Sequence, residues 1–235
     1  MKALILAAGI GSRLAPLTYE LPKSLVPVNG MPILFKQIEN LHQNGIIDIS
    51  IVTGYRADLL KNAVKEKYSD VQFIDNVDYL DTNNMYSAYL ARDLFSDTPF
   101  LMMNADVFYD ASVIHSLLQY PAESAIVTDI GNYLDESMKV IEKDGRLVKI
   151  SKAITKEEAL GASIDVYKFS ANAGSLFFNA CKTYIEEKKE LKLWSEVALD
   201  DILKKSIFKA CPLNGRWMEI DNHDDLKVAE AMFKG

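Results

Sequence analysis

Apolar and polar positions alternate in blocks along the first half of the chain. Short apolar runs that end in small or polar residues, typical of buried parallel strands, occupy residues 2–7, 46–54, 71–75 and 99–106. Segments with apolar positions at helical spacing lie between them, at residues 31–44, 56–67 and 83–95. This alternation predicts an α/β fold with a Rossmann-like, doubly wound sheet. In such sheets, ligands bind at the carboxyl ends of the strands.

The pattern changes after about residue 122. Strand-like runs follow at residues 124–130, 138–143 and 146–151, and the pair Asp144-Gly145 predicts a tight hairpin turn between the last two. Further elements are expected as helices at about 170–189 and 195–204, strands near 207–211 and 217–220, and a last helix from Asn222. We therefore expect a mixed sheet, in which a small antiparallel lobe follows a parallel core.

The composition excludes several classes of protein. The net charge of −7 leaves no basic surface for a nucleic-acid backbone. No apolar run approaches the ~18 residues that span a bilayer, and the first run breaks at Gly9, so neither a membrane span nor a signal peptide is expected. Cys181 and Cys211 are too few for a disulfide framework or a four-thiolate metal site. We expect reduced thiols and a cytoplasmic location.

A glycine-containing loop follows the first strand, with Gly9 and Gly11 two positions apart. A dinucleotide-binding fingerprint would need a third glycine where Leu14 stands, which disfavours a hydride-transferring oxidoreductase. A Walker loop would need glycine rather than Pro22 directly before Lys23. Neither of the two familiar phosphate motifs is present in this loop.

The loop nevertheless offers groups that bind phosphate. Its small residues would let backbone N–H groups approach an anion, and Arg13 and Lys23 bring positive charge to the same region. An ordinary turn with two solvated cations fits these residues equally well. Prolines at positions 16, 22, 27 and 32 are expected to keep the following segment from forming a helix, and a long loop of this kind is usually functional.

The stretch LILAAGIGSRLAPLT…PKSLVPVNGMPIL closely resembles the N-terminal signature of nucleotidyltransferases that join a nucleoside triphosphate to a sugar phosphate or small phospho-compound. The resemblance implies a nucleotidyltransferase fold in one domain, residues 1–235, with a nucleotide-binding half of about 1–121 and a substrate-side half of about 122–235. It also implies that Arg13 and Lys23 are catalytic cations. The loop is implied to cradle the triphosphate, and the residues implied to bind the nucleotide here are Leu6, Ala7, Ala8, Gly9, Gly11, Ser12 and Ala105.

A second stretch, DTNNMYSAYLARDLF at residues 81–95, is similar to a segment of bacterial phosphocholine cytidylyltransferases. The similarity implies that Thr82, Asn83 and Asn84 lie beside a pyrimidine base and that the nucleotide is CTP. Amide side chains offer both a donor and an acceptor, as reading a base edge demands. A role for Thr82 or Asn83 as helix N-cap is compatible with this.

Two aspartates are implied by the resemblance to bind Mg²⁺. Asp106 ends the apolar run at 99–106, and Asp221 follows the strand expected at 217–220. From the residues alone, a single aspartate at a strand end is more often a turn or cap residue. One or two carboxylates suffice for Mg²⁺, because phosphate oxygens and water complete its coordination. Asp110 is expected instead to cap the helix that begins at Ala111.

The implied reaction transfers CMP from CTP to the phosphate or phosphonate of an amine-bearing acceptor, with release of pyrophosphate. Candidate acceptors are phosphocholine, 2-aminoethylphosphonate and phosphoglutamine, the last from capsule-modification pathways. A sugar 1-phosphate is the alternative. A non-catalytic nucleotide-binding regulator is disfavoured, because such relatives tend to lose the cations or carboxylates that this chain keeps. Homodimers are common in the family, so a homodimer is a further expectation.

Several later residues are candidates for contact with the acceptor. Lys152 matches a family lysine that contacts the acceptor phosphate, although Ser-Lys-Ala replaces the usual Glu-Lys-Pro, and Lys139 is its rival. Aromatic and acidic side chains that could together receive an ammonium group are Tyr133, Tyr167, Trp194 and Glu196. Aromatic residues also commonly fill cores, and Glu196 is equally compatible with a helix-start acid.

Overall fold

The computed structural model describes residues 1–133 and 136–234. Its centre is a mixed sheet whose main path has the strand order β10-β9-β11-β6-β1-β4-β5. The parallel part consists of β1 (Lys2–Ala7), β4 (Ile49–Thr53), β5 (Gln72–Asp75) and β6 (Phe100–Asn104). Strand β1 lies between β4 and β6, and its apolar run is buried on both faces of the sheet, as the sequence predicts.

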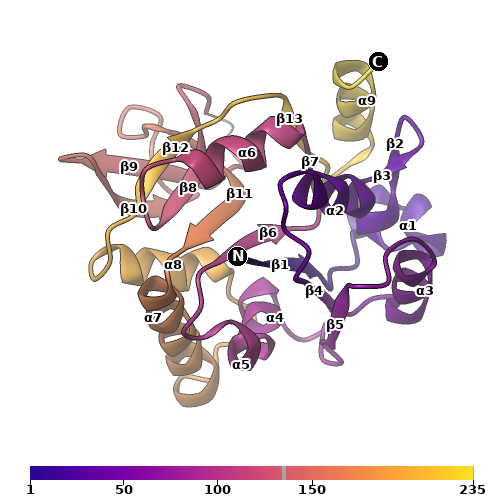
Figure 1. The fold of residues 1–235 in the computed structure, drawn as a ribbon, viewed down its shortest axis with the longest axis horizontal. Coiled ribbons are helices and arrows are strands. Elements are labelled where there is room, and N and C mark those ends of the chain that lie inside the picture. Colours follow the sequence, from indigo (N-terminus) through magenta and orange to yellow (C-terminus); the bar gives the residue numbers. More distant parts are fainter. Residues whose placement is uncertain (134–135, 235) are drawn as a thin grey trace.

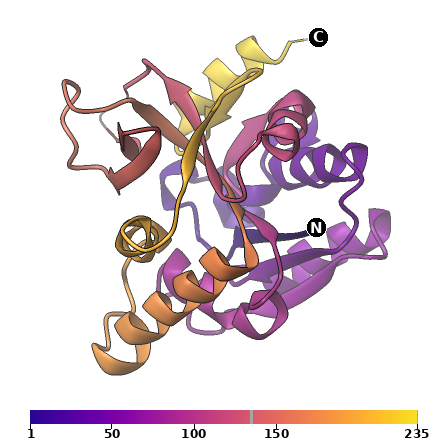
Figure 2. The same ribbon diagram turned by 60° about the vertical axis from the view of Figure 1, so that its left-hand side comes forward.

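The second half of the chain extends the same sheet. Its strands are β8 (Ala125–Ile130), β9 (Lys139–Lys143), β10 (Arg146–Ser151), β11 (Gly161–Phe169) and β12 (Lys209–Pro212). Strand β11 pairs antiparallel with β6, β8 and β9. The β9–β10 hairpin lies at the end of the molecule remote from β5 in both views (Figures 1 and 2). Asp144 and Gly145 both have positive φ in its turn, as an Asp-Gly hairpin requires.

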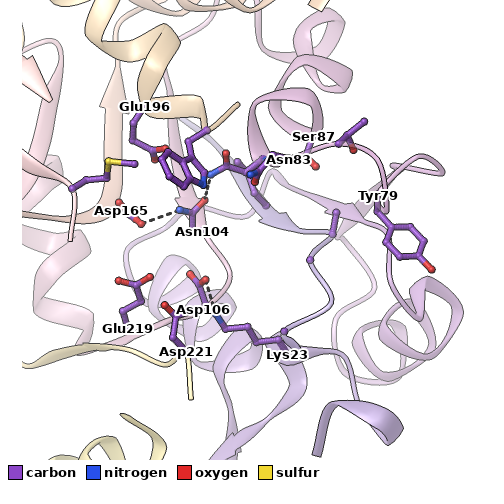
Figure 3. Close-up of a pocket in the computed structure, with 18 of the residues that line it drawn as sticks. Lys23, Tyr79, Asn83, Ser87, Asn104, Asp106, Asp165, Glu196, Glu219 and Asp221 are labelled. Carbon is purple, nitrogen blue, oxygen red and sulfur yellow. Dashed lines mark hydrogen bonds and ion pairs between the residues drawn. The ribbon is translucent and has the colours of Figure 1, made fainter. Parts of the chain in front are cut away.

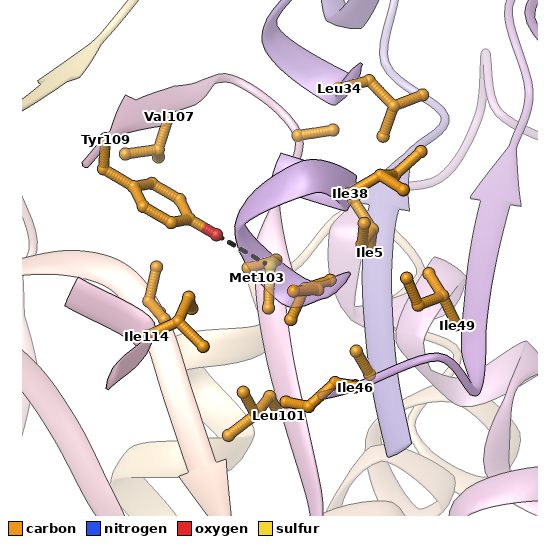
Figure 4. Close-up of a cluster of buried hydrophobic side chains, with 14 of the residues drawn as sticks. Ile5, Leu34, Ile38, Ile46, Ile49, Leu101, Met103, Val107, Tyr109 and Ile114 are labelled. Carbon is orange, nitrogen blue, oxygen red and sulfur yellow. Dashed lines mark hydrogen bonds between the residues drawn. The ribbon is translucent and has the colours of Figure 1, made fainter. Parts of the chain in front are cut away.

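Helices cover both faces of the sheet, which confirms the doubly wound mixed α/β prediction. One face carries α2 (Ile33–Gln43), α3 (Ala57–Lys67) and α6 (Ala111–Gln119). The other carries α4 (Asn84–Leu90), α5 (Arg92–Phe95), α7 (Ala171–Lys182) and α8 (Ser195–Leu203). Alternate residues of β1 serve the two cores: Ile5 packs toward Leu34 and Ile38 of α2 (Figure 4), while Leu4 and Leu6 join the opposite core.

A third, smaller core fixes the loop after β1. The short elements that surround it are α1 (Leu17–Glu20), β2 (Pro27–Val28), β3 (Met31–Pro32), β7 (Val107–Tyr109), β13 (Trp217–Glu219) and α9 (His223–Met232), with 3₁₀ turns at Ser12–Leu14 and Lys23–Leu25. Leu14 and Val26 from the loop pack with Phe108 of β7 and with Ile220 and Ala229. The loop that carries the two cations is thereby attached to the elements that carry the predicted metal ligands.

The structure corrects several expected elements. The nine-residue strand β11 was not predicted. The proline-containing segment has helical turns at Leu17–Glu20 and Lys23–Leu25, because prolines restrict only their own and the preceding residue. The helix expected at 83–95 is divided into α4 and α5, and the end of the helix expected at 170–189 is a π-helical turn at Thr183–Glu187.

Asp110 departs from its expected role. It occupies the N-cap position of α6, but its carboxylate makes no cap hydrogen bond. The two carboxylate oxygens accept hydrogen bonds from the backbone N–H, Nε and Nη2 of Arg216 at 2.9–3.0 Å. Asp110 therefore connects the start of α6 to the start of β13.

Among the helices of the described residues, none has the length and apolar character needed to cross a bilayer.

Candidate active site

A cavity of about 340 Å³ opens at the carboxyl ends of β1 and β6 (Figure 3). Strand-end loops of the first half form one wall, and β11, β13 and the start of α8 contribute residues from the second half. The predicted residues that line it are Leu6, Ala8, Gly9, Gly11, Ser12, Arg13, Lys23, Thr82, Asn83, Asn84, Asp106, Lys152, Trp194, Glu196 and Asp221. The fold therefore gathers residues from both ends of the sequence in one cavity.

Two cations and two carboxylates form the centre of this cavity. Lys23 Nζ lies 2.8 Å from Asp106 Oδ2 and 2.6 Å from Asp221 Oδ1. Arg13 Nη2 lies 2.8 Å from Asp221 Oδ2. The Lys23 side chain is only 13% exposed, whereas that of Arg13 is 63% exposed. Lys23 is therefore held inside the site, and Arg13 reaches it from the rim.

Local structure explains how the chain holds these groups together. Gly11 has φ +68°, and a Cβ there would lie 2.6 Å from Lys23 Cβ, so the loop can turn beside Lys23 only with glycine. Strand β13 pairs with β7, and the Ile220 N–H donates to the Asp106 carbonyl at 2.9 Å. The capping box of Asn222 and Asp225 then starts α9 directly after Asp221.

Asp106, Glu219 and Asp221 could together hold a metal ion. Each offers a carboxylate oxygen, and these oxygens lie within 4.8 Å of one another. Asp106 Oδ1 is buried and accepts no hydrogen bond from the described residues, which fits an oxygen kept for a ligand. Hard carboxylate oxygens suit Mg²⁺, so the donor set fits the expected ion. Glu219 was not among the predicted ligands.

The charges of this cluster are strongly coupled. Burial and the neighbouring carboxylates of Asp165, Asp106 and Asp221 raise the pKa of Glu219 to about 9. Burial acts in the same direction on Asp221, but Lys23 and Arg13 outweigh it and lower the Asp221 pKa. For Lys23, burial favours the neutral form, yet Asp106 and Asp221 raise its pKa above the ordinary value. Lys23 is thus positively charged at neutral pH, as a phosphate-binding group must be.

The three residues expected beside the base, Thr82, Asn83 and Asn84, each make hydrogen bonds within the protein. Asn83 caps α4 by accepting from the Asn84 N–H at 2.8 Å. Asn84 Oδ1 accepts from the Ser195 N–H at 2.8 Å, which connects α4 to the start of α8. Thr82 Oγ1 donates to the Asp78 carbonyl and accepts from Asn76 Nδ2. The cap role is confirmed for Asn83, while base contact by this stretch stays a prediction.

The opposite part of the cavity is lined by Asn104 and Asp165, which the sequence did not single out, and by Glu196, which it did, while the predicted Tyr167 lies behind them. Asn104 Nδ2 donates to Asp165 Oδ2 at 3.0 Å. The Tyr167 hydroxyl lies 2.8 Å from both Asp165 Oδ1 and Glu196 Oε1. Burial, Glu196 and Asp106 raise the pKa of Asp165 to about 7, and burial also raises the pKa of Glu196. Figure 3 shows Asp165 and Glu196 on one side of Asn104, apart from Lys23.

Some predicted residues do not line the cavity. The ring of Tyr167 is fully buried behind Asp165, so the expected ring contact with an ammonium group is wrong. Tyr133 packs against Lys156 outside the lining. Lys139 is buried and donates to the Ser137 carbonyl, whereas its rival Lys152 lines the cavity, with Nζ 4.9 Å from the Trp194 ring centre. Ala7 and Ala105 are buried next to lining residues.

Comparison with known proteins decides the family. Residues 2–139 match the family model described as nucleotidyl transferase, which spans more than half of the chain and includes the glycine-containing loop, Lys23 and Asp106. The chain belongs to the nucleotidyl transferase family. The predicted family, fold class and transferase activity are thereby confirmed, and the acidic cluster is one that could bind the divalent metal such enzymes generally use.

Relatives of this nucleotidyl transferase include cytidylyltransferases, and the similarity extends over nearly the full length of both chains. The chain is 30% identical to CTP:phosphoglutamine cytidylyltransferase of Campylobacter jejuni, over 97% of this chain and 98% of that protein. It is 29% identical to choline-phosphate cytidylyltransferase of Haemophilus influenzae, over 96% and 94%. The solved CTP:phosphocholine cytidylyltransferase of Streptococcus pneumoniae superposes with a TM-score of 0.81 and 28% identity, over 99% of both chains. These matches imply a nucleoside triphosphate and a small phospho-compound as substrates.

Proposed function

We propose that this nucleotidyl transferase is a Mg²⁺-dependent cytidylyltransferase that transfers CMP from CTP to a small amine-bearing phosphate or phosphonate. The observation that carries the proposal is the pairing of Lys23 and Arg13 with Asp106 and Asp221 beside the glycine-containing loop. Cations for a triphosphate and carboxylates for its metal meet at one point of the cavity. Full-length similarity to cytidylyltransferases supports CTP as the nucleotide.

In the proposed reaction, an anionic oxygen of the acceptor attacks the α-phosphorus of CTP. The bond from that phosphorus to the β-phosphate oxygen breaks, and pyrophosphate leaves. No protein nucleophile is needed, because the attacking oxygen already carries negative charge, so catalysis consists of positioning and charge stabilisation. Mg²⁺ bound to Asp106 and Asp221, with Glu219 beside them, would neutralise phosphate charge and bring the two substrates together.

Lys23 and Arg13 have distinct parts in this proposal. Lys23 is held beside Asp106 and Asp221, and a bound triphosphate and metal would compete for these partners. Release of Lys23 from the carboxylates would let its ammonium group move to phosphate oxygens. Arg13, at the exposed rim, can hold phosphate oxygens in a bidentate manner. Lys152 is the lysine of the cavity wall that we assign to the acceptor phosphate.

A pyrophosphate-release assay tests the proposal. CTP and UTP are each combined, with and without Mg²⁺, with phosphocholine, 2-aminoethylphosphonate, phosphoglutamine or glucose 1-phosphate. We expect release only with Mg²⁺, CTP and an amine-bearing acceptor. If glucose 1-phosphate is the only acceptor that gives release, the chain is a sugar 1-phosphate transferase and the proposal is overturned.

Two further expectations stay predictions, namely a homodimer and a cytoplasmic location. Light scattering tests the first of them directly.

A further inference from the structure

The acceptor end of the cavity contains a residue in an unfavourable backbone conformation. Asp165 lies within β11 with φ +59°, in the left-handed region that favours glycine. The pairing of β11 with β8 shifts register between Ser163 and Tyr167, so the strand bulges at this point. Ile164 and Val166 on either side are completely buried, whereas Asp165 lines the cavity. The bulge therefore turns a carboxylate out of the sheet and into the site.

The surrounding hydrogen bonds hold this carboxylate in one orientation. Oδ2 accepts from Asn104 Nδ2, and Oδ1 lies 2.8 Å from the Tyr167 hydroxyl. The same hydroxyl lies 2.8 Å from Oε1 of Glu196, which is 3% exposed and also lines the cavity. A single Tyr167 hydroxyl proton serves two carboxyl groups, and Ser195 Oγ donates to Glu196 Oε1 at 3.2 Å. The four carboxyl oxygens can accept more hydrogen bonds than these donors and Asn104 supply, so this end of the cavity has a surplus of acceptors. Such a surplus suits a ligand that donates several hydrogen bonds.

Within the described ranges 1–133 and 136–234, aromatic side chains do not form an open cage at this end of the cavity. Tyr167 turns only its hydroxyl toward the carboxylates, and its ring is fully buried. Trp194 lines the cavity and is 45% exposed, but Lys152 Nζ already lies over its ring at 4.9 Å. A trimethylammonium group has no N–H and is best bound by several open aromatic faces. An ammonium group that carries N–H donors is best bound by carboxylate oxygens.

We infer that Asp165, supported by Glu196, determines acceptor specificity by binding a primary ammonium group, and that it selects such a group over a quaternary one. The inference rests on the proposed function and narrows its acceptor class. Asn104 connects the two parts of the cavity that the acceptor would contact. Its side chain donates to Asp165, while Asp106, two residues further on, belongs to the metal cluster. The acceptor phosphate at the metal cluster and its ammonium group at Asp165 would then lie in the same cavity.

Three matched acceptors test the inference on the complete wild-type protein. Phosphoethanolamine and phosphocholine differ only by methylation of the nitrogen, and propyl phosphate replaces the ammonium group with a methyl group. Pyrophosphate release with CTP and Mg²⁺ gives kcat/KM for each, with phosphoglutamine as a second, larger primary ammonium compound. We expect kcat/KM for a primary ammonium compound to exceed that for phosphocholine and for propyl phosphate at least tenfold.

The variant Asp165→Asn keeps the shape of the side chain and removes its charge. We expect KM for the primary ammonium acceptor to rise at least tenfold, while KM for CTP stays within twofold and Tm does not fall. Asp93→Asn, on the exposed surface of α5, is the matched control and should change none of these values. Glu196→Gln should weaken the same acceptor preference to a smaller extent.

The outcomes separate this inference from the proposed function. Pyrophosphate release that favours phosphocholine, or an Asp165→Asn variant with unchanged acceptor KM, would overturn the role of Asp165 and leave cytidylyl transfer intact. An equal rise of KM for CTP and acceptor would also overturn it, because that would indicate a general structural role. No release by the wild-type protein with any of the acceptors would instead reject the proposed function, on which the inference depends.

Discussion

At the scale of single residues, the site combines groups that destabilise one another in the free protein. Asp106, Asp165, Glu219 and Asp221 line one cavity, and Lys23 lies among them. Burial of like charges raises the free energy of the folded state, which explains why the pKa of Glu219 rises to about 9. Buried carboxyl groups with strongly shifted pKa values are typical of functional sites.

The first prediction concerns Asp106. The variant Asp106→Asn removes a charge from the metal cluster while keeping its shape, so we expect kcat for pyrophosphate release to fall by about 100-fold or more. The variant should also need a higher Mg²⁺ concentration for half-maximal activity. Tm should change little, because Lys23 keeps its ion pair with Asp221. Asp93→Asn is the control, and turnover near that of the wild type would contradict the metal assignment.

The residues of the site differ in how far sequence could predict them. Arg13, Lys23 and Asp106 occur in contiguous motifs or at a strand end. Glu219 was missed, although it stands two positions before Asp221, and side chains two positions apart point to the same side of an extended segment. Asp165 had no such signal. Its exposure to the cavity depends on a bulge against β8, and the register of a long-range strand pair cannot be inferred from one sequence.

At the scale of elements, the long central strand β11 is the clearest one that the sequence did not predict. The parallel strands β1, β4 and β6 are buried on both faces and show as mainly apolar runs, with Ser50 of β4 as the one polar residue inside them. Strand β11 is equally central, but Asp165 and Lys168 interrupt its pattern. Lys168 is buried, and this is tolerated because its Nζ donates hydrogen bonds to the carbonyls of Leu117 and Tyr120 at the end of α6. This partner lies about fifty residues away, beyond any local pattern.

The contact between Asp110 and Arg216 gives a prediction at this scale, because it joins α6 to β13. Its hydrogen bonds to Arg216 lower the pKa of Asp110, against the opposing effect of burial. A lowered pKa means that the interaction stabilises the fold above the unfolded-state pKa of about 4 and that this contribution is lost as pH falls through the lower folded-state pKa. Asp110→Asn should therefore destabilise the protein at pH 7 and have a smaller effect in acid.

The measurement is Tm of Asp110→Asn and wild type at pH 7, 5 and 3.5. We expect only a small decrease at pH 7, about 2–4 °C, since Arg216 is half-exposed and solvent screens the pair. The difference should be similar at pH 5 and should shrink at pH 3.5. A difference that does not depend on pH would show that the charge of Asp110 is not what joins the two elements.

At the scale of the whole molecule, the two halves of the sequence share one sheet and one cavity. Strand β11 from the second half pairs with β6 from the first, and the second large core draws on both. Segments from the first and last parts of the sequence are in contact, because Lys23 binds Asp221 and the loop after β1 packs against α9. A site built from both ends of the sequence is complete only when the whole sheet has formed.

This arrangement predicts that residues 1–235 unfold as one cooperative unit, as expected for a single domain. Both tryptophans, Trp194 and Trp217, lie in the second half, and Trp217 pairs with Tyr109 of β7 in the first. Their fluorescence therefore reports on the second half and its contact with the first, whereas far-UV circular dichroism reports on the helices and strands of both halves. Urea unfolding followed by the two methods should give coincident transitions with one midpoint. The pairing of β6 with β11 is the reason, since separation would expose a buried edge of each. A fluorescence midpoint displaced from the dichroism midpoint would instead show that the halves unfold independently, and the single-domain prediction would then be wrong.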